Sequence, residues 1–553
     1  MMSTYLKHCI VDALALAYRT TTGEEPPPEY LSIRATDRPE FGDYSSNIAL
    51  LDGAARGSVP RKIAEELLAA LQAQGHVSLF EKVQVAGPGF LNFFLHPETL
   101  GTSLREILSA DRRFGRTEVG TGQTIQVEFV SSNPTGPLTV GHGRQAVLGD
   151  VLASLFERIG YRVVREYYFN DEGRQIDLLA ESLWVRFREL DGDVHEIPEG
   201  GYQGEYLKGV AETLRAETEE TFPALDEETR KWFRQEAVAR MTAWIKQDLS
   251  ALGVSFDEWF SERTLHEKGE IDAALAALKE KGGVYEADGA LWLAAESHGG
   301  AKDSVLIRSD GRPTYLMVDI AYHMDKHVRG FDRVLDVQGA DHQVEQTCVK
   351  AALRILGYPE GFLDYAVHQF VSLKEGGAVR RMSTRAGRFV TLRDLIQDLG
   401  KDIVRFFMVS RKPEAHLDFD LDLARSESID NPATYIQYAH TRIASIFRKA
   451  DAEEIPWASV DLSPLVEAEE RELIKSLDAF PEVIQNAAQS FAPHLLAEYA
   501  MQLSRAFHAY YDRHRVLTDD QKVSHARLAL LRALRIALRE SLEILGMDAP
   551  EAM

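Results

Sequence analysis

The sequence predicts an α/β protein built around a doubly wound parallel sheet of the Rossmann type that carries a helical insertion. A small α+β domain precedes the sheet and an all-α bundle follows it. Three observations predict this fold class. A length of 553 residues exceeds what one hydrophobic core supports, a strand–helix–strand pattern begins at Thr124, and helical periodicity fills the chain from Asn431 onwards. We expect segments at 1–118, 119–400 (with an acidic helical insertion at about 175–300), 401–430 and 431–553.

The first segment has the pattern of a small α+β unit. Its opening helix is amphipathic and lacks the small-residue cleavage site of a secretory signal. A second helix is predicted at 60–71, and residues 83–95 alternate like two strands around a Gly-Pro-Gly turn. A helix near 98–110 completes the unit.

Residues 124–169 have the pattern of one βαβ unit. Strands are predicted at 124–130 and 161–169, and Gly160 stands where a helix C′ glycine is expected. Between the strands, apolar residues fall on one helical face: Val147, Leu148, Val151, Leu152, Leu155, Phe156 and Ile159. The unit is typical of the first half of a doubly wound sheet, which binds ligands at the carboxyl ends of its strands.

The elements after this unit have weaker signals. Residues 181–300 contain 26 acidic and 13 basic side chains and are predicted to be mostly helical. Sheet-like segments follow at 304–309, 313–318 and 333–339, with a helix beyond them. The helical stretches from Asn431 to the end predict a separate bundle.

Composition narrows the functional classes. No apolar run approaches the roughly 20 residues of a membrane span, and two cysteines, Cys9 and Cys348, are too few for a disulfide framework or a four-cysteine zinc site. We therefore expect a cytoplasmic protein without bound zinc. The net charge of −24 argues against a nucleic-acid partner, but residues 374–412 carry 10 basic and 4 acidic side chains. A local basic surface of this kind is compatible with a nucleic-acid partner.

The stretch EFVSSNPTGPLTVGHGRQAVLGD (128–150) runs from a strand through a Pro/Gly-rich bend into a helix. GHGRQA (141–146) is a loose dinucleotide fingerprint with Glu166 as its acidic partner, but ten residues separate it from the strand. The alternative is a phosphate bound by the free N–H groups and dipole of the helix N-terminus, beside His142. A packing role for His142 is the plainer explanation. No GxxxxGK[ST] occurs, which excludes a P-loop NTPase.

Three further clusters could face the same site. Tyr315 and Asp319 are four residues apart and share one side of a helix or strand, although a buried salt bridge would also explain Asp319. The strand at 333–339 ends in a group of small and polar residues: Gly339, Asp341, His342 and Gln343. The arginine-rich run at 380–388 surrounds a Ser-Thr-Arg-Ala-Gly turn that suits a polyphosphate, although such runs are usually solvated surface.

Together these stretches resemble class I arginyl-tRNA synthetases over essentially the whole chain. Their order along one chain is more specific than any single motif: EFGDYSSNIAL (40–50), GPGFLNFFL (87–95), SNPTGPLTVGHGR (132–144), EYYFNDEGRQI (166–176), RMSTRAG (381–387) and NPATYIQYAHTRI (431–443). SNPTGPLTVGHGR is similar to the His-Ile-Gly-His motif of the class, and RMSTRAG takes the place of its KMSKS loop. Thr139 stands for the first histidine of that motif, and Arg381 and Thr384 stand for the two lysines of that loop.

The resemblance implies a two-step reaction that needs no protein nucleophile. Arginine and ATP, accompanied by Mg²⁺, form arginyl-adenylate and pyrophosphate, and the 2′-OH of the terminal tRNA ribose then takes the arginyl group. A monomer and tRNA-dependent activation are also implied. The replaced motif residues leave open a catalytically weakened relative that binds tRNA or arginine. A Rossmann oxidoreductase is the other alternative, disfavoured by the long loop and the helical tail.

The resemblance also assigns residue roles. Adenylation residues are expected at Thr139, Gly141, His142, Arg381, Met382, Ser383, Thr384 and Arg385. Further ATP contacts are expected from Pro134, Gly136, Gly143, Gly339, Asp341 and His342. Arginine contacts are expected from Glu128, Asn133, Tyr315, Asp319 and Gln343. A pair of carboxylates suits a guanidinium, which is planar, always charged and offers five donors, whereas lysine would leave acceptors unpaired.

The helical C-terminal segment is implied to read the anticodon of tRNA(Arg). Its aromatic and basic side chains can stack on bases or pair with phosphates, the candidates being Tyr435, Tyr438, His440, Arg442, Arg532 and Arg535. Taken singly, each aromatic residue is more often part of a core. The segment 1–118 is implied, by the resemblance alone, to meet the tRNA elbow.

Overall fold

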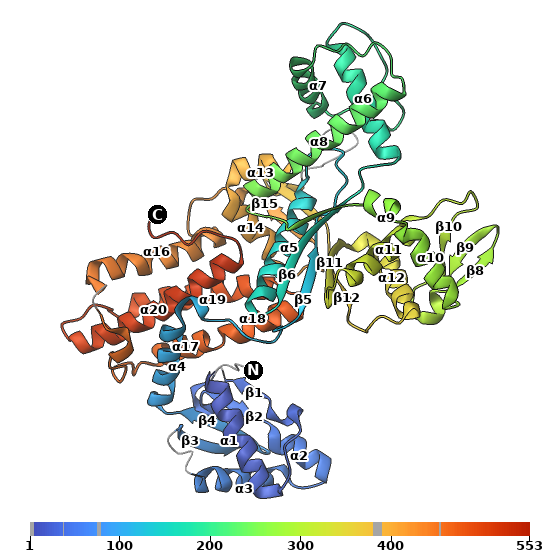
Figure 1. The fold of residues 1–553 in the computed structure, drawn as a ribbon. Helices are drawn as coiled ribbons and strands as arrows, with labels where there is room; N and C mark the ends of the chain where they lie inside the picture. The colour runs from blue at the N-terminus through green and yellow to red at the C-terminus, as the bar shows by residue number, and fades with distance from the viewer. Residues whose placement is uncertain (1–4, 37, 75–78, 380–389, 453–454) are drawn as a thin grey trace.

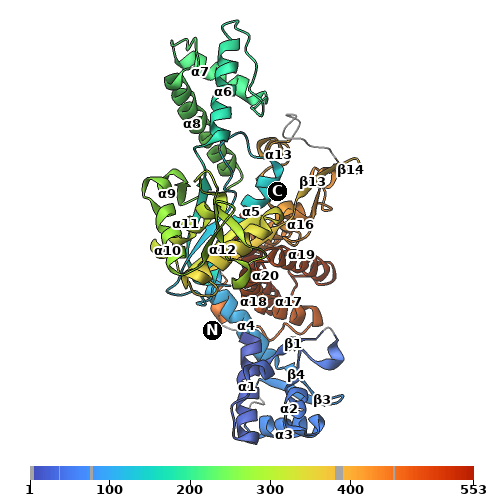
Figure 2. The same ribbon diagram turned by 90° about the vertical axis from the view of Figure 1, so that its right-hand side faces the viewer.

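The computed structural model describes residues 5–36, 38–74, 79–379, 390–452 and 455–553. The parallel sheet lies between the N-terminal unit at the bottom of Figure 1 and a projecting helical unit at its top. The C-terminal helices pack beside the sheet domain and reach the N-terminal unit (Figure 2). None of the described helices is long and apolar enough to cross a membrane.

The N-terminal unit is an antiparallel sheet of order β1-β2-β4-β3 with helices packed on it, as predicted. The hairpin β3–β4 turns at Gly87–Gly89. Gly89 has a φ of 145°, and an added Cβ would lie 2.9 Å from the carbonyl carbon of Pro60, so this turn requires glycine. The elements are α1 (Tyr5–Thr22), β1 (Ile33–Ala35), β2 (Tyr44–Ser46), α2 (Ile48–Arg56), α3 (Pro60–Ala73), β3 (Phe80–Ala86), β4 (Phe90–Leu95) and the connecting helix α4 (Pro97–Ala110).

The central sheet has five parallel strands in the order β12-β11-β5-β6-β7. From β5 the chain winds to one side through β6 and β7, and then to the other side through β11 and β12. The predicted doubly wound fold is confirmed, and its topological switch lies between β5 and β11. The elements are β5 (Thr124–Glu128), α5 (Val140–Arg158), β6 (Arg162–Phe169), β7 (Glu258–Ser261), β11 (Arg333–Gly339), α12 (Gln343–Leu356) and β12 (Leu363–His368).

Helix α5 is fixed firmly against this sheet. The apolar face predicted from the sequence is buried, and Gly160 has a φ of 97° just beyond the helix, as the prediction of a C′ glycine requires. Gly149 lets the helix approach the segment after β5, because an added Cβ there would lie 2.1 Å from the Phe129 ring. This packing determines where the N-terminus of α5 meets the carboxyl ends of the strands.

The expectation of one helical insertion at about 175–300 is wrong in its second half. Three helices do project from the sheet around their own core, α6 (Arg174–Glu189), α7 (Tyr206–Glu217) and α8 (Glu227–Ala251). The chain then returns to the main sheet as β7. Beyond it lie α9 (Arg263–Glu267), α10 (Glu270–Glu280) and a separate antiparallel sheet of β8 (Val284–Ala287), β9 (Ala290–Leu293) and β10 (Ser304–Ile307).

Two sheet-like predictions also need correction. The segment at 304–309 does form β10, but in the small antiparallel sheet and outside the main one. The segment at 313–318 is the start of helix α11 (Tyr315–Val328), which begins where the Thr314 side chain accepts the backbone N–H of Met317. A run of six residues is too short to separate the helical from the strand period.

The C-terminal bundle is helical throughout, as predicted, with α16 (Pro432–Ala450), α17 (Ala468–Asp478), α18 (Phe480–Gln489), α19 (His494–Arg513) and α20 (Gln521–Ile544). Before it lie β13 (Val371–Glu375), β14 (Ala378–Val379), α13 (Leu392–Leu399), α14 (Lys401–Val409), β15 (Leu417–Asp420) and α15 (Leu421–Ala424). The buried Arg405 ties the bundle to α5, since it donates to Asp150 at 2.5 Å and to the Leu545 carbonyl at 2.7 Å.

Candidate functional site

Many of the predicted site residues meet in one cavity of about 730 Å³ at the carboxyl ends of β5 and β11. This is the topological switch point, where doubly wound sheets bind ligands. Ten predicted residues line the cavity: Glu128, Asn133, Thr139, Gly141, His142, Tyr315, Asp319, Gly339, Asp341 and His342. They come from separate segments of the chain, so only the fold brings them together.

The N-terminus of α5 forms one wall of this cavity. Thr139 is its N-cap residue, and its backbone N–H donates to Nδ1 of His142 at 3.1 Å. Burial, with His368 nearby, lowers the pKa of His142 to about 4, so the ring is neutral at pH 7. Because Nδ1 accepts, Nε2 carries the proton and is a donor. Gly141 is exposed, and apart from the backbone of its own helix the Thr139 hydroxyl is the one described group within 4 Å of an added Cβ. The wall therefore offers donors and space to an anion.

Four predicted residues do not line the cavity: Pro134, Gly136, Gly143 and Gln343. Gly143 faces helix α13, where an added Cβ would lie 2.7 Å from Leu392 Cδ1. Gly136 faces the insertion, where an added Cβ would lie 3.1 Å from the Tyr206 hydroxyl, which donates to the Thr135 carbonyl. Gln343 is the exposed first residue of α12. At the two glycines, close packing against neighbouring elements accounts for the missing side chain.

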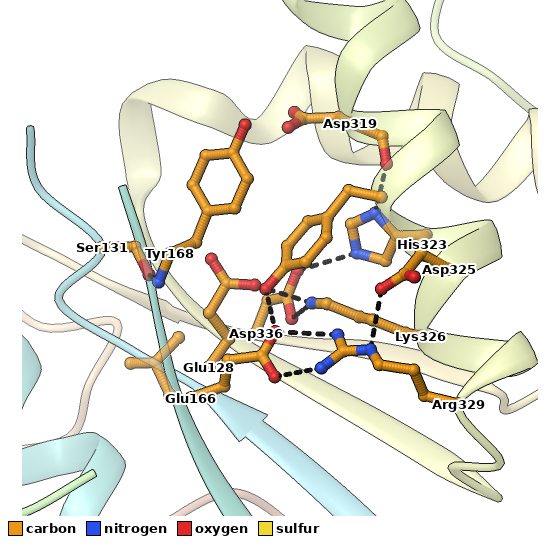
Figure 3. A network of polar contacts seen from close by, with 12 residues as sticks. Glu128, Ser131, Glu166, Tyr168, Asp319, His323, Asp325, Lys326, Arg329 and Asp336 are labelled. Atoms are coloured by element: carbon orange, nitrogen blue, oxygen red, sulfur yellow. Dashed lines mark hydrogen bonds and ion pairs between the residues drawn. The ribbon is translucent and has the colours of Figure 1, made fainter. Parts of the chain in front are cut away.

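The floor of the cavity is built on a row of acidic residues. Asp336 of β11, Glu128 of β5 and Glu166 of β6 are register partners on adjacent parallel strands, about 4.8 Å apart from one strand to the next. All three side chains are buried. Helix α11 lies across the row and supplies Lys326, and Arg329 follows at its end (Figure 3). The sheet thus concentrates negative charge where the predicted arginine contacts lie.

Lys326 joins two members of the row. Its Nζ donates to Glu128 Oε2 at 2.6 Å and to Asp336 Oδ1 at 2.9 Å. Burial opposes the charge of this lysine, but the two carboxylates outweigh burial and raise the pKa of Lys326. Burial would raise the pKa of Asp336, but Lys326 and His323 hold it at about 2. The pKa of Glu128 shifts in the opposite direction to that of Asp336. Burial raises the pKa of the Glu128 carboxyl by more than Lys326 lowers it.

Asp319 lines the same cavity but takes no part in these ion pairs. Within the described part of the chain its carboxylate makes no hydrogen bond or ion pair, and in Figure 3 it lies apart from the dashed contacts. Burial, together with Glu345 and Glu128, raises the pKa of Asp319 well above its usual range. The structural alternative of a buried salt bridge for Asp319 therefore has no support among the described residues. A cationic ligand would supply the missing partner.

Polar side chains at the cavity edge are held by neighbours. Asn133 donates to Gln175 at 2.9 Å and accepts the backbone N–H of Asn170 at 3.2 Å. Tyr315 is 66% exposed at the first turn of α11, so its hydroxyl is free to meet a ligand. On the opposite side His342 lies 3.5 Å from Glu345, and this contact raises the pKa of His342.

The sequence did not identify Lys326, Asp336 or Tyr168 as parts of the site. Asp336 and Tyr168 line the cavity, and Tyr168 donates to Glu262 at 2.6 Å. A helical interpretation of residues 315–328 would have placed Asp319, His323 and Lys326 on one face at three- and four-residue spacing. The expectation of a strand concealed that signal.

The residues predicted to face the polyphosphate, Arg381, Met382, Ser383, Thr384 and Arg385, lie outside the described residues. The segment that follows them is well placed: Thr391 pairs with Thr139, and the Leu392 N–H donates to the Leu138 carbonyl at 2.8 Å. Thr391 and Leu392 therefore lie beside the N-terminus of α5.

The predicted RNA-binding residues divide into two groups and one exception. Tyr435 and Tyr438 both contact the ring of His508, and Arg442 lies over the rings of Tyr438 and Tyr511. Arg532 and Arg535 line a separate cavity of about 850 Å³ between α16 and α20. His440 is the exception, because it is 1% exposed and its Nδ1 lies 2.9 Å from the Pro550 carbonyl. It anchors the C-terminal residues and has no surface to offer a base.

Comparisons with known proteins agree with this geometry. Three family models match successive parts of the chain: "Arginyl tRNA synthetase N terminal domain" at 4–95, "tRNA synthetases class I (R), catalytic domain" at 103–415 and "DALR anticodon binding domain" at 436–553. The arginine–tRNA ligase of Thermotoga maritima is 43% identical over 94% of this chain and 95% of its own. That of Legionella pneumophila (strain Paris) is 41% identical over 98% of both chains.

Solved structures agree as well. Arginyl-tRNA synthetase from Thermus thermophilus, 26% identical, superposes with a TM-score of 0.77 over the full length of both chains. Methionyl-tRNA synthetase from Mycobacterium tuberculosis, 12% identical, shares the fold with a TM-score of 0.57 over 77% of this chain and 92% of its own. Since one family model spans more than half of the chain and relatives above 40% identity span nearly all of it, the chain belongs to the arginyl-tRNA synthetase family.

Proposed function

We propose that the cavity between β5 and β11 is where this enzyme activates arginine with ATP and passes it to tRNA(Arg). Membership in the family makes the chain an arginine–tRNA ligase. The observation that carries the assignment of the site is the combination, in one cavity, of a half-buried carboxylate at Asp319 that has no described partner and a donor-bearing helix N-terminus at His142. The first suits a guanidinium and the second suits a phosphate.

The acidic side of the cavity binds the arginine side chain. A guanidinium offers five N–H donors in a rigid plane and stays protonated, so it pairs with Glu128 and Asp319 without adjusting its own charge. Asn133 and Tyr315 orient the α-amino and α-carboxylate groups. Gln343, which lies beside the cavity at the start of α12, contributes at its edge. This arrangement places the substrate carboxylate toward the N-terminus of α5.

The opposite side binds ATP. His142 Nε2–H and Thr139 donate to phosphate oxygens, Gly141 admits them closely, and Gly339, Asp341 and His342 contact the adenosine. Pro134, Gly136 and Gly143 shape the loop that carries these groups. The substrate carboxylate attacks the α-phosphorus, the bond to the bridging oxygen breaks, and pyrophosphate leaves with the electron pair. Fixed donors stabilise the developing charge. Arg381 and Arg385 would supply positive charge to the β- and γ-phosphates, Met382, Ser383 and Thr384 belong to the same loop, and Mg²⁺ bound with ATP would add to that charge.

The second step transfers the arginyl group to tRNA. The 2′-OH of the terminal ribose attacks the adenylate carbonyl, and AMP leaves. The C-terminal helices bind the anticodon through Tyr435, Tyr438 and Arg442, with Arg532 and Arg535 near the phosphates, and the N-terminal domain binds the tRNA elbow. Stacking on these rings would contribute about 1–3 kcal/mol per base. The matching anticodon-binding model at 436–553 supports this assignment.

Arginine-dependent exchange of labelled pyrophosphate into ATP tests the proposal. Exchange that requires cognate tRNA is the expected result, and a His142→Ala variant should lose most of it while still binding tRNA. Absence of exchange from wild-type protein that binds tRNA would instead favour a catalytically weakened relative, for which Thr139, Arg381 and Thr384 would be the cause. A monomeric state and a cytoplasmic location stay predictions, which gel filtration and cell fractionation would check.

A further inference from the structure

Lys326 is a fully buried cation directly behind the arginine side of the cavity. Its side chain is 0% exposed and does not line the cavity. It makes ion pairs at 2.6 Å with Glu128 and at 2.9 Å with Asp336, and its Nζ lies 4.3 Å from the centre of the Tyr322 ring. The Tyr322 hydroxyl in turn donates to Glu166, and this hydrogen bond holds the ring in place beside Lys326. Lys326 therefore has one position and one set of partners (Figure 3).

Two cations divide the row of acids between them. Lys326 serves Asp336 and Glu128, whereas Arg329 pairs with Glu166 through both of its terminal nitrogens, at 2.5 and 2.9 Å. Neither Arg329 nor Glu166 lines the cavity. Neighbouring buried carboxylates raise one another's pKa and take up protons unless a cation compensates them. Of the two cations, only Lys326 is thus paired with carboxylates that line the cavity, Glu128 and Asp336.

The geometry also fixes which oxygen of Glu128 is available. Lys326 holds Oε2, and no described group donates to Oε1 although Glu128 lines the cavity. The backbone of Glu128 is fixed as well, because β5 is paired on both sides, with β11 and β6. The ion pair with Lys326 therefore favours the charged form of Glu128 and occupies one oxygen of its carboxylate, and among the described groups the other oxygen has no donor.

We propose that Lys326 is a positioning residue for arginine specificity. By keeping Glu128 charged and oriented, it lets the cavity distinguish a guanidinium from a neutral group of the same shape. The inference rests on the proposed arginine site and adds a residue that does not touch the substrate. It predicts that losing Lys326 weakens arginine binding through Glu128 and leaves ATP binding unchanged.

The test compares Lys326→Met with a control, Arg329→Met, which removes the other cation of the same row, one that is 25% exposed. Pyrophosphate exchange with tRNA present gives the KM values for arginine and ATP. Inhibition by citrulline, in which a neutral urea replaces the guanidinium, gives the discrimination. For Lys326→Met we expect the arginine KM to rise about tenfold to a hundredfold, the ATP KM to hold, and the preference for arginine over citrulline to shrink. Arg329→Met should change the arginine KM by no more than about twofold.

Two further variants separate charge from packing. Lys326→Gln keeps a hydrogen-bond donor but no charge, and it should behave like Lys326→Met if charge is decisive. Asp336→Asn combined with Lys326→Met removes the competing carboxylate, so it should recover part of the arginine affinity. Lys326→Met should also make the arginine KM depend on pH. Without Lys326, the groups facing Glu128 are Asp336, Glu166, Asp319 and His323, so the Glu128 carboxyl loses its proton at a higher pH. The arginine KM of this variant should therefore fall as pH rises.

The outcomes are distinct. Equal losses of arginine affinity in Lys326→Met and Arg329→Met, with an unchanged citrulline ratio, would overturn the inference and make Lys326 a structural ion pair. If Lys326→Met does not fold, the preference of Lys326→Gln for arginine over citrulline tests the inference in its place. Loss of exchange in the wild-type protein would instead refute the proposed function, whatever Lys326 does.

Discussion

We expect Asp319→Asn to increase the stability of the protein and to weaken its activity with arginine. Asp319 is half-buried near Glu128 and Glu345, its carboxylate has no described partner, and its pKa is raised. Replacing it with the isosteric amide removes that like-charge repulsion, which we expect to increase stability by about 1 kcal/mol at pH 8. A buried carboxylate kept for its ligand is a common form of the trade-off between stability and activity.

The same change should remove one charge-assisted pair with the arginine guanidinium. Such hydrogen bonds contribute about 1.5–3 kcal/mol, so the arginine KM should rise roughly 10- to 150-fold. Pyrophosphate exchange with tRNA present measures this, and Asp341→Asn is the matched control. Asp341 lines the same cavity on the adenosine side, so its amide should affect the ATP KM and leave the arginine KM near its wild-type value.

The stability gain should depend on pH in a defined direction. The folded pKa of Asp319 lies above its unfolded value, so between the two values the folded protein binds more protons, and stability falls as pH rises. The difference in melting temperature between Asp319→Asn and wild type should therefore be small near pH 4 and larger at pH 8. A less stable variant with an unchanged arginine KM would refute the reasoning and make Asp319 a structural group.

His142→Ala should lower the exchange rate about 10²- to 10³-fold by removing a donor to the developing charge, and because the pKa of His142 is about 4, its ionisation should not affect the wild-type rate between pH 6 and 9. Gly143→Ala should lower the melting temperature, since its Cβ would lie 2.7 Å from a Leu392 methyl, whereas Gly141→Ala should leave melting nearly unchanged and raise the ATP KM. Tyr438→Ala should raise the tRNA KM by the loss of about 1–3 kcal/mol of stacking, while His440→Ala should lower thermal stability instead, because its ring binds the Pro550 carbonyl.

Local pattern was sufficient for the elements whose signals are short-range. The βαβ unit at 124–169 follows from alternation, a 3.6-residue period and a glycine at the helix end, all of which a single segment carries. The ordered motifs identified the family for the same reason, because each is contiguous. The prediction of a strand at 313–318 was wrong, because six residues do not distinguish a strand from the first turns of α11.

The pairing between residues far apart in the sequence depends on the folded chain. The register that aligns Asp336, Glu128 and Glu166 joins strands far apart in the sequence, and a shift of one residue would turn these side chains to the other face of the sheet. The burial of His440 depends in the same way on the C-terminal residues folding back onto α16. The chemical groups that this protein carries, and its family, could be identified from the order of the residues alone. The fold decided which of those groups are paired, which are buried, and which face a ligand, because burial and electrostatic pairing are properties of neighbours that the chain order does not record.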